Sequence, residues 1–210
     1  MVLKSVQVHS VRVNRAPVLT LWAAIVAERL GFDRDEALTL GRVVAGLDAY
    51  SKGKALGLFS PRPKTVREMR NRLERGGTLR IELLHRAVPA IQTPDGIRAL
   101  SRSKPVSPES VRRYLESKFG EALPAVEKAM RTLARALPPD ELARKAYKLY
   151  ELFRPRVPPG LRGWGAAGSL DLDRIEELAR AARRARLRVT AGDHRRRART
   201  SRGAGVPVPG

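Results

Sequence analysis

Arginine and lysine are the residues whose number and spacing could do chemistry in this sequence, and that chemistry is phosphate binding. Residues 52–86 hold ten cations and three anions, and residues 180–203 hold ten arginines and one aspartate. The two segments carry net charges of +7 and +9, most of the formal net charge of +21. Guanidinium groups bind phosphate oxygens in a bidentate geometry, so such clusters indicate a polyanionic partner.

The candidate contact residues come from these two segments and from one loop. In the loop, residues 154–170, glycines frame a tryptophan whose indole could stack on a base. The candidates are Lys52, Lys54, Arg62, Lys64, Arg67, Arg70, Arg75, Trp164, Arg183, Arg184, Arg195, Arg196 and Arg197. Explanations without nucleic-acid binding stay open. The cations at 67–75 could solvate the outer face of a helix, the tryptophan could cover an edge of the core, and the basic terminal segment could only add solubility.

Histidine, cysteine and carboxylate spacing shows no catalytic or metal-binding signature. His9, His85 and His194 lie far apart in the sequence, and there is no cysteine. There is no HExxH pattern, and SKGKALG at 51–57 lacks the GxxxxGK[ST] spacing of a nucleotide phosphate loop. His85 is more typical of a strand end than of a general base. We therefore expect a protein that is not an enzyme and that has no cofactor and no metal site.

Composition narrows the class of protein further. Hydrophobic residues make up 42% of the 210 residues, which is enough for a core, while aromatic residues make up only 5%. Arginine outnumbers lysine by 33 to 9, a ratio that phosphate recognition and a GC-rich genome both favour. There is no signal-peptide core and no uninterrupted run of about 18 apolar residues. We expect a cytoplasmic protein without membrane contact.

The elements that must position the cations are mostly helices. Apolar residues recur at helical spacing in several segments joined by short turns, which is typical of a helical bundle. We predict a mainly α fold: a helical-bundle-like single domain with a minor β element and a disordered basic C-terminal tail. The expected boundaries are 1–13 for an N-terminal arm or edge strand, 14–180 for the helical domain and 181–210 for the tail.

Local signals predict where several helices begin. Asn14 is the expected cap of a central helix that is apolar on almost all sides. Asp33 and Glu36 have the spacing of a capping box for the next helix, and Ser107 followed by Pro108 predicts another start.

Two further elements are expected around residue 90. Residues 78–84, TLRIELL, alternate as a strand does, and the valine-rich N-terminal arm is the expected partner. Thr93-Pro94-Asp95 predicts a short helix through about Ser101.

The helix pair at residues 17–49 also allows a DNA-binding helix-turn-helix. Small, glycine and apolar residues stand at suitable positions, namely Ala27, Gly31, Ala37 and Leu40. However, the second helix begins Asp33-Arg34-Asp35-Glu36, which places carboxylates where phosphates would lie, and it offers few polar side chains to read bases. We therefore favour an ordinary helical hairpin in the core.

Two segments resemble a family of small uncharacterised bacterial proteins. They are NRAPVLTLWAAIVAERLGFDRDEALTLG near the N-terminus and YELFRPRVPPGLRGWGAAGSLDLDRI in the second half, and the likeness covers roughly residues 14–179. The resemblance implies no substrate and no site residues, because no activity is established for the family. It implies only that the basic segment from about residue 180 is an appendage to a common body.

The expected function is non-enzymatic binding of nucleic acid through its phosphates, with duplex DNA ahead of RNA. One alternative is an RNA- or ribosome-associated factor, and another is a protein-interaction or assembly module whose charge meets an acidic protein surface. An enzyme with a site lined by arginine and the loop 154–170 is a further alternative. Base specificity and a homo-oligomeric state stay open.

Overall fold

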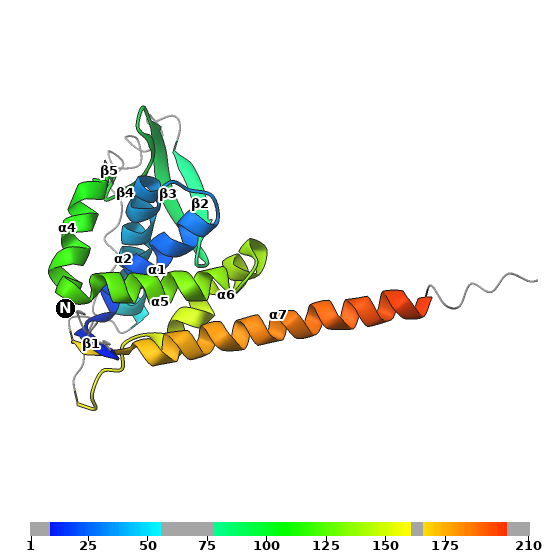
Figure 1. Cartoon of the computed structure of the whole chain (residues 1–210). Helices are drawn as coiled ribbons and strands as arrows, with labels where there is room; N and C mark the ends of the chain where they lie inside the picture. Colours follow the sequence, from blue (N-terminus) through cyan, green and yellow to red (C-terminus); the bar gives the residue numbers. More distant parts are fainter. Residues whose placement is uncertain (1–8, 56–77, 161–165, 201–210) are drawn as a thin grey trace, which may run out of the picture.

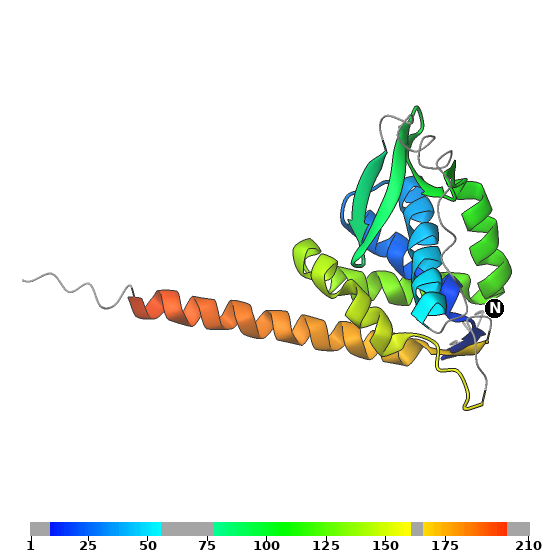
Figure 2. The ribbon, with the colours of Figure 1, turned by 180° about the vertical axis from the view of Figure 1, so that it is seen from behind.

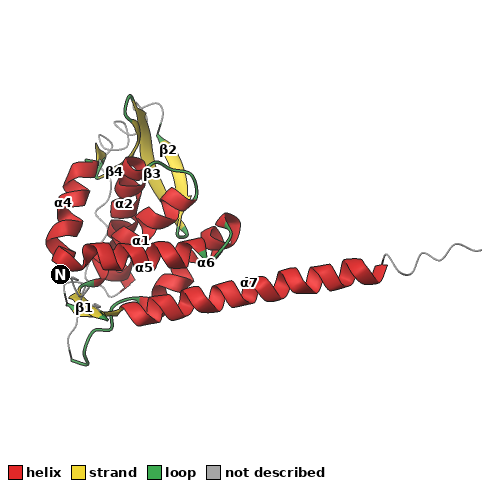
Figure 3. Cartoon of the chain, in the orientation of Figure 1, coloured by secondary structure: helices red, strands yellow, loops and turns green. Residues whose placement is uncertain are grey.

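The computed structural model describes residues 9–55, 78–160 and 166–200, with side chains left out at 52–55 and 189–200 (Figure 1). The helices are α1 (Arg15–Arg29), α2 (Arg34–Ala55), α4 (Pro108–Phe119), the 3-10 helix η1 (Gly120–Ala122), α5 (Leu123–Arg135), α6 (Pro139–Phe153) and α7 (Leu172–Thr200). The strands are β1 (Ser10–Val13), β2 (Leu79–Leu83), β3 (Arg86–Thr93), β4 (Gly96–Ser101), β5 (Lys104–Pro105) and β6 (Gly168–Asp171). The predicted mainly α fold with a minor β element is confirmed (Figure 3).

The β structure forms two separate antiparallel units. Strands β2, β3, β4 and β5 make a four-stranded sheet in that order, and β1 pairs with β6 in a two-stranded ribbon. The sheet lies on one side of α2, and α4 lies on the other (Figures 1 and 2). None of the described helices is long and apolar enough to cross a membrane.

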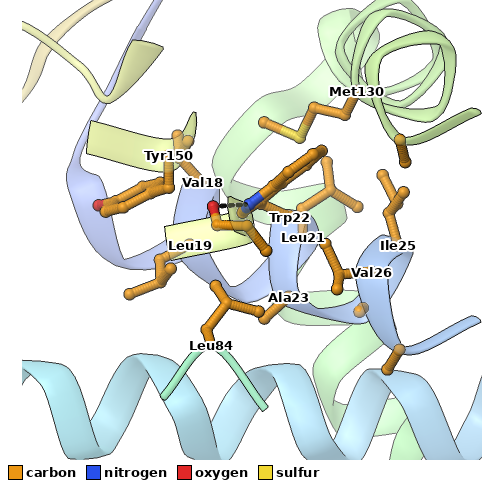
Figure 4. Close-up of a cluster of buried hydrophobic side chains, with 14 of the residues drawn as sticks. Val18, Leu19, Leu21, Trp22, Ala23, Ile25, Val26, Leu84, Met130 and Tyr150 are labelled. Atoms are coloured by element: carbon orange, nitrogen blue, oxygen red, sulfur yellow. Dashed lines mark hydrogen bonds between the residues drawn. The ribbon is translucent and has the colours of Figure 1, made fainter. Parts of the chain in front are cut away.

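Helix α1 is the centre of the core, as its all-round apolar sequence predicts. Trp22 is fully buried, and its indole N–H donates a hydrogen bond of 2.8 Å to the carbonyl of Ala146 in α6. Figure 4 shows the ring of Trp22 lying close to Met130 of α5. Phe153 meets the same ring edge-on, with 5.3 Å between the centroids. One aromatic residue therefore joins the helices on both sides of α1.

Helix α2 crosses α1 at very short range, because Gly41 has no side chain. A Cβ atom at this position would lie 2.4 Å from the carbonyl oxygen of Thr20. Helix α2 also packs on β3, β4 and α4, and its residues from Ala37 to Gly41 are buried. Most of the described part of α2 is therefore packed into the core, as expected of the core hairpin that we favoured.

The predicted capping box at the start of α2 is confirmed, and it also holds the sheet. The Asp33 side chain accepts from the Glu36 amide at 2.7 Å, and Glu36 Oε2 accepts from the Asp33 amide at 3.1 Å. The second oxygen of Glu36 accepts from the amide of Ile97 in β4 at 2.8 Å. Thr39 accepts from the next outward amide of β4, that of Ala99, at 3.1 Å. Helix α2 thus satisfies backbone donors that β4 does not pair with another strand.

Two predictions around residue 90 are wrong. Residues 93–101 are not helical: β3 and β4 form a hairpin, and Gly96 supplies the positive φ of +100° that its turn requires. Strand β2 pairs with β3, with Leu79 opposite Ala90, and not with the N-terminal arm. The arm pairs instead with β6. The Pro94-Asp95 pair starts a turn here because a glycine follows it directly.

Two helix boundaries also differ from expectation. Asn14 precedes α1 in an extended conformation, but its side chain makes no capping hydrogen bond. Helix α7 continues to Thr200, past residue 181, where we expected a disordered tail to begin. The sequence there is rich in alanine and arginine, which are strong helix formers. Residues 201–210 lie outside the described part of the chain.

Candidate nucleic-acid interface

Helix α7 is anchored to the body only along its first turns. Leu172, Ile175 and Ala179 are buried, and the helix packs against α5 and β1. Asp171 caps the start by accepting from the Arg174 amide at 3.1 Å. Beyond these turns the helix extends away from the body (Figures 1 and 2). With 29 residues at about 1.5 Å each, it is about 44 Å long.

The free part of α7 begins with a run of arginines. Residues 180–188 contain five arginines and no acidic residue, and the side chains at 183–188 are all exposed. Arg180, Arg184 and Arg188 follow one another at intervals of four residues, so they form one row along the helix. Arg184 comes nine residues after the buried Ile175, which is about half a turn out of phase at 3.6 residues per turn. The row therefore faces away from the body.

Charge is segregated along the outer face of α7. The acidic residues Asp173, Glu176 and Glu177 lie in its first turns, and the arginine run follows. Acidic side chains near the start of a helix and basic ones toward its end match the helix dipole. Asp173 also contacts His9 at 3.0 Å, and Glu177 contacts Arg174 at 3.1 Å. Asp173 and Glu177 are thus engaged locally, beside the body.

Several arginines of the body, in contrast, have acidic partners. Arg86 contacts Asp48 at 2.9 Å, and Arg112 contacts Asp35 at 2.6 Å. Arg131 bonds both Glu28 and Glu127, and the hydrogen bond to Glu28 is the main cause that raises the pKa of its guanidinium. These pairs join helices to one another and to the sheet. On α7, no ion pair joins Arg180, Arg184 or Arg188 to a carboxylate of the described residues.

The structure describes only part of the predicted contact set. Arg183 and Arg184 lie exposed on α7. Lys52 and Lys54 belong to the last turn of α2, and Arg195, Arg196 and Arg197 belong to the last turns of α7, by their backbone alone. Arg62, Lys64, Arg67, Arg70, Arg75 and Trp164 lie outside the described residues. The structure adds Arg180 and Arg188 to the predicted pair, and their spacing of four to Arg184 is a signal that the sequence already carried.

His85 lies at the rim of a groove and not at a recognisable catalytic site. Leu84 and His85 form the turn between β2 and β3 with positive φ angles of 50° and 57°, and Leu84 is anchored in the core. The His85 ring donates from Nε2 to the carbonyl of Arg144 at 3.2 Å. The groove has a volume of about 290 Å³ and an apolar floor that includes Val26 and Leu30. Because the ring N–H is already bonded to the backbone, the groove suits an apolar group better than a proton transfer.

Titratable groups in the described residues are shifted by burial and by local hydrogen bonds. Burial, and then the hydrogen bond to Asp48, raises the pKa of Tyr147. Burial also raises the pKa of Tyr114 and of Tyr150. The hydrogen bond from Ser107 is the main cause that lowers the pKa of Glu109 at the start of α4. Each shift is explained by helix packing or capping, and within the described ranges no group of three potential ligands could hold a metal ion.

Comparisons with protein-family models, with curated proteins and with solved structures found no match to this chain. Fold and site together define a mainly α protein with a small antiparallel sheet and a projecting basic helix.

Proposed function

We propose that this protein binds nucleic acid through phosphate contacts and has no catalytic role. The observation that carries the proposal is the arginine row Arg180, Arg184 and Arg188, exposed on a helix that leaves the body. Each phosphate that an arginine neutralises releases a condensed counterion, which drives association at low salt. The cation-rich segment 52–75 adds charge of the same sign in the sequence.

Duplex DNA fits the projecting helix better than RNA does. An α-helix with its side chains is about 10–12 Å wide, and the major groove of B-DNA is about 12 Å wide. The major groove of A-form RNA is deep and too narrow for side chains to read. Residues 180–200 contain no aromatic residue, so the helix offers no stacking platform for single strands. We therefore place duplex DNA ahead of structured RNA.

The expected binding is sequence-tolerant. Arginine is the main polar side chain of the exposed run, and phosphate contacts carry no base information. A helix that reads bases normally also presents asparagine, glutamine or similar side chains to base edges. Affinity should therefore change little between duplexes of different sequence.

A salt titration tests the proposal. Binding of a fluorescently labelled duplex is measured by anisotropy for the full chain and for the double variant Arg183→Glu, Arg184→Glu. The logarithm of the association constant should fall steeply with the logarithm of salt, by about 0.9 for each phosphate contacted. The double variant should bind at least about tenfold more weakly and show a slope smaller by roughly two.

A matched variant separates this local effect from a change in net charge. Arg113→Glu alters an exposed arginine on α4, away from α7, and should leave the slope almost unchanged. Equal losses in both variants would mean that charge acts only at long range. Binding that ignores salt would instead favour the protein-interaction module, and tighter binding to structured RNA than to duplex DNA would correct the class of nucleic acid.

A further inference from the structure

The ribbon formed by β1 and β6 brings together three side chains from distant parts of the sequence. Arg12 of β1 stands opposite Ser169 of β6. On the other edge of β6, Arg156 forms a bridge to the same serine, with backbone hydrogen bonds of 3.0 Å and 3.1 Å in the two directions. Ser169 is therefore the middle member of a row of three residues.

All three side chains lie on one exposed face of the ribbon. Residues directly opposite each other in antiparallel strands point to the same side. The backbone N–H and C=O groups of Ser169 both form hydrogen bonds with Arg156, and such a hydrogen-bonded pair has a Cα separation of about 5.5 Å. Ser169 and Arg12 form a non-hydrogen-bonded pair, whose Cα separation is about 4.5 Å. Each of the three residues is solvent-exposed. Two guanidinium groups thus flank one hydroxyl group.

This row carries positive charge that its described surroundings do not neutralise. Within the described residues, neither Arg12 nor Arg156 forms a hydrogen bond or ion pair with a carboxylate. The two acidic residues beside the ribbon are already engaged: Asp171 caps α7 and Asp173 contacts His9. Two unneutralised cations on either side of one residue repel each other, and an anion between them would remove that cost.

More cations lie next to the row. Arg15 donates to the carbonyl of Pro155 at 3.3 Å, which holds it against the segment that contains Arg156. Arg15 and Arg154 are both close enough to Tyr150 to oppose the rise of its pKa. Arg15 and Arg154 therefore add positive charge beside the segment that carries Arg156.

Gly168 keeps the row in place. A Cβ atom on this residue would lie 2.6 Å from the carbonyl oxygen of Arg156, a distance that no side chain tolerates. The glycine therefore lets the segment with Arg156 approach β6 closely enough to bridge to Ser169. Gly168 thus lies between two segments: it pairs with Val13 of β1 on one side, and the segment with Arg156 packs against it on the other.

We infer that Arg12, Ser169 and Arg156 form a phosphate-binding site. The two guanidinium groups supply paired N–H donors and the serine supplies an O–H donor, which is the chemistry that a tetrahedral phosphate accepts. The acidic turns of α7, with Asp173, Glu176 and Glu177, separate this site from the arginine run. The site therefore does not rest on the proposed role of α7.

The test uses the ¹⁵N-labelled full chain and inorganic phosphate. Phosphate is titrated while chloride keeps the ionic strength constant, and the Nε–H signals of the two arginines and the amide signal of Ser169 are followed by NMR. Saturable shifts of these signals are expected. Arg12→Gln with Arg156→Gln should weaken phosphate binding at least about tenfold, since hydrogen bonds to charged groups are the strong ones. Ser169→Ala should weaken it about threefold through loss of one donor.

The control is Arg102→Gln in the turn between β4 and β5, at the opposite end of the body (Figure 1). This variant should bind phosphate as the unmodified chain does. All variants replace exposed side chains, so their amide spectra should keep the native dispersion. If the double arginine variant does not fold, the Ser169→Ala variant still tests the site. Shifts that grow linearly with phosphate, or that the arginine substitutions leave unchanged, would overturn the proposal.

A second arm identifies the source of the phosphate. An unlabelled DNA duplex is added to the Arg183→Glu, Arg184→Glu variant, whose α7 contacts are weakened. If the duplex shifts the same ribbon signals in competition with phosphate, the site takes phosphates of the nucleic-acid backbone. If only inorganic phosphate shifts them, the site takes free phosphate groups. A salt slope that stays unchanged in the α7 variant would overturn the role of α7, whereas phosphate shifts that the ribbon substitutions leave unchanged would overturn the ribbon site, so the two failures can be told apart.

Discussion

The carboxylate of Asp48 is fully buried and contacts the guanidinium of Arg86 at 2.9 Å, which links α2 to β3. The Tyr147 hydroxyl donates to the same carboxylate oxygen at 2.9 Å, which adds α6 to the link. Three elements that are distant in sequence therefore meet at one charge. Asp48 lies in the last turn of α2 before residue 52, where the first basic segment of the sequence begins.

Removing Arg86 should destabilise the fold strongly. Arg86→Leu leaves a buried carboxylate without its cation, and breaking a buried pair in this way costs about 3–5 kcal/mol. Asp48→Asn should cost less, because a neutral amide can still accept from Tyr147. Urea unfolding followed by circular dichroism measures both. A loss below about 1 kcal/mol for Arg86→Leu would show that water replaces the cation.

Gly41 and Gly46, both in α2, should respond in opposite ways to alanine. Gly41→Ala places a Cβ atom against the α1 backbone, which should destabilise the protein by about 1–3 kcal/mol or more. Gly46→Ala meets nothing within 4 Å and lies in the same helix, so it should stabilise by about 0.5–1 kcal/mol. Thermal unfolding of the two variants gives the comparison. Similar midpoints for both would contradict the close crossing of α1 and α2.

Glu36 should contribute to the sheet as well as to its helix. Glu36→Ala removes the acceptor of the Ile97 amide and one half of the capping box, at an expected cost of about 1–3 kcal/mol. Glu36→Gln keeps one acceptor oxygen and should lose less. Amide hydrogen exchange at Ile97 is the specific readout. Unchanged protection of this amide in the alanine variant would argue against the bond.

The buried Tyr150 should make the protein sensitive to alkali. Burial raises its pKa above the ordinary value of 10.0, so the unfolded chain releases this proton at lower pH than the folded chain does. The stability that the neutral hydroxyl contributes is therefore complete below about pH 10 and falls as the pH rises further. Tyr150→Phe should flatten the decline of the unfolding free energy above pH 10. Urea titrations at several alkaline pH values test this, and an unchanged slope would contradict it.

Short-range signals predicted the helical framework well. The capping box of Asp33 and Glu36 and the cap at Ser107 are present because each needs residues only three positions apart. The buried state of α1 follows from apolar residues on all its sides. Asn14 shows the limit of such signals: the residue type and the extended backbone are right for a cap, but its side chain makes no capping hydrogen bond. Pro94-Asp95 forms a hairpin turn where the sequence predicts a helix start, because helix caps and hairpin turns use the same residues.

The arginine run of α7 could be read from the chain alone, because adjacent charges need no partner to be recognised. The row Arg12, Ser169 and Arg156 could not, since strand register between remote segments decides which residues become neighbours. Local spacing determines helices, caps and charge density through contacts within one turn. Only packing of the whole body decides the strand partners, the crossing at Gly41 and the ribbon site. These contacts join segments that are far apart in the sequence, and their separation in the sequence does not determine their distance in space.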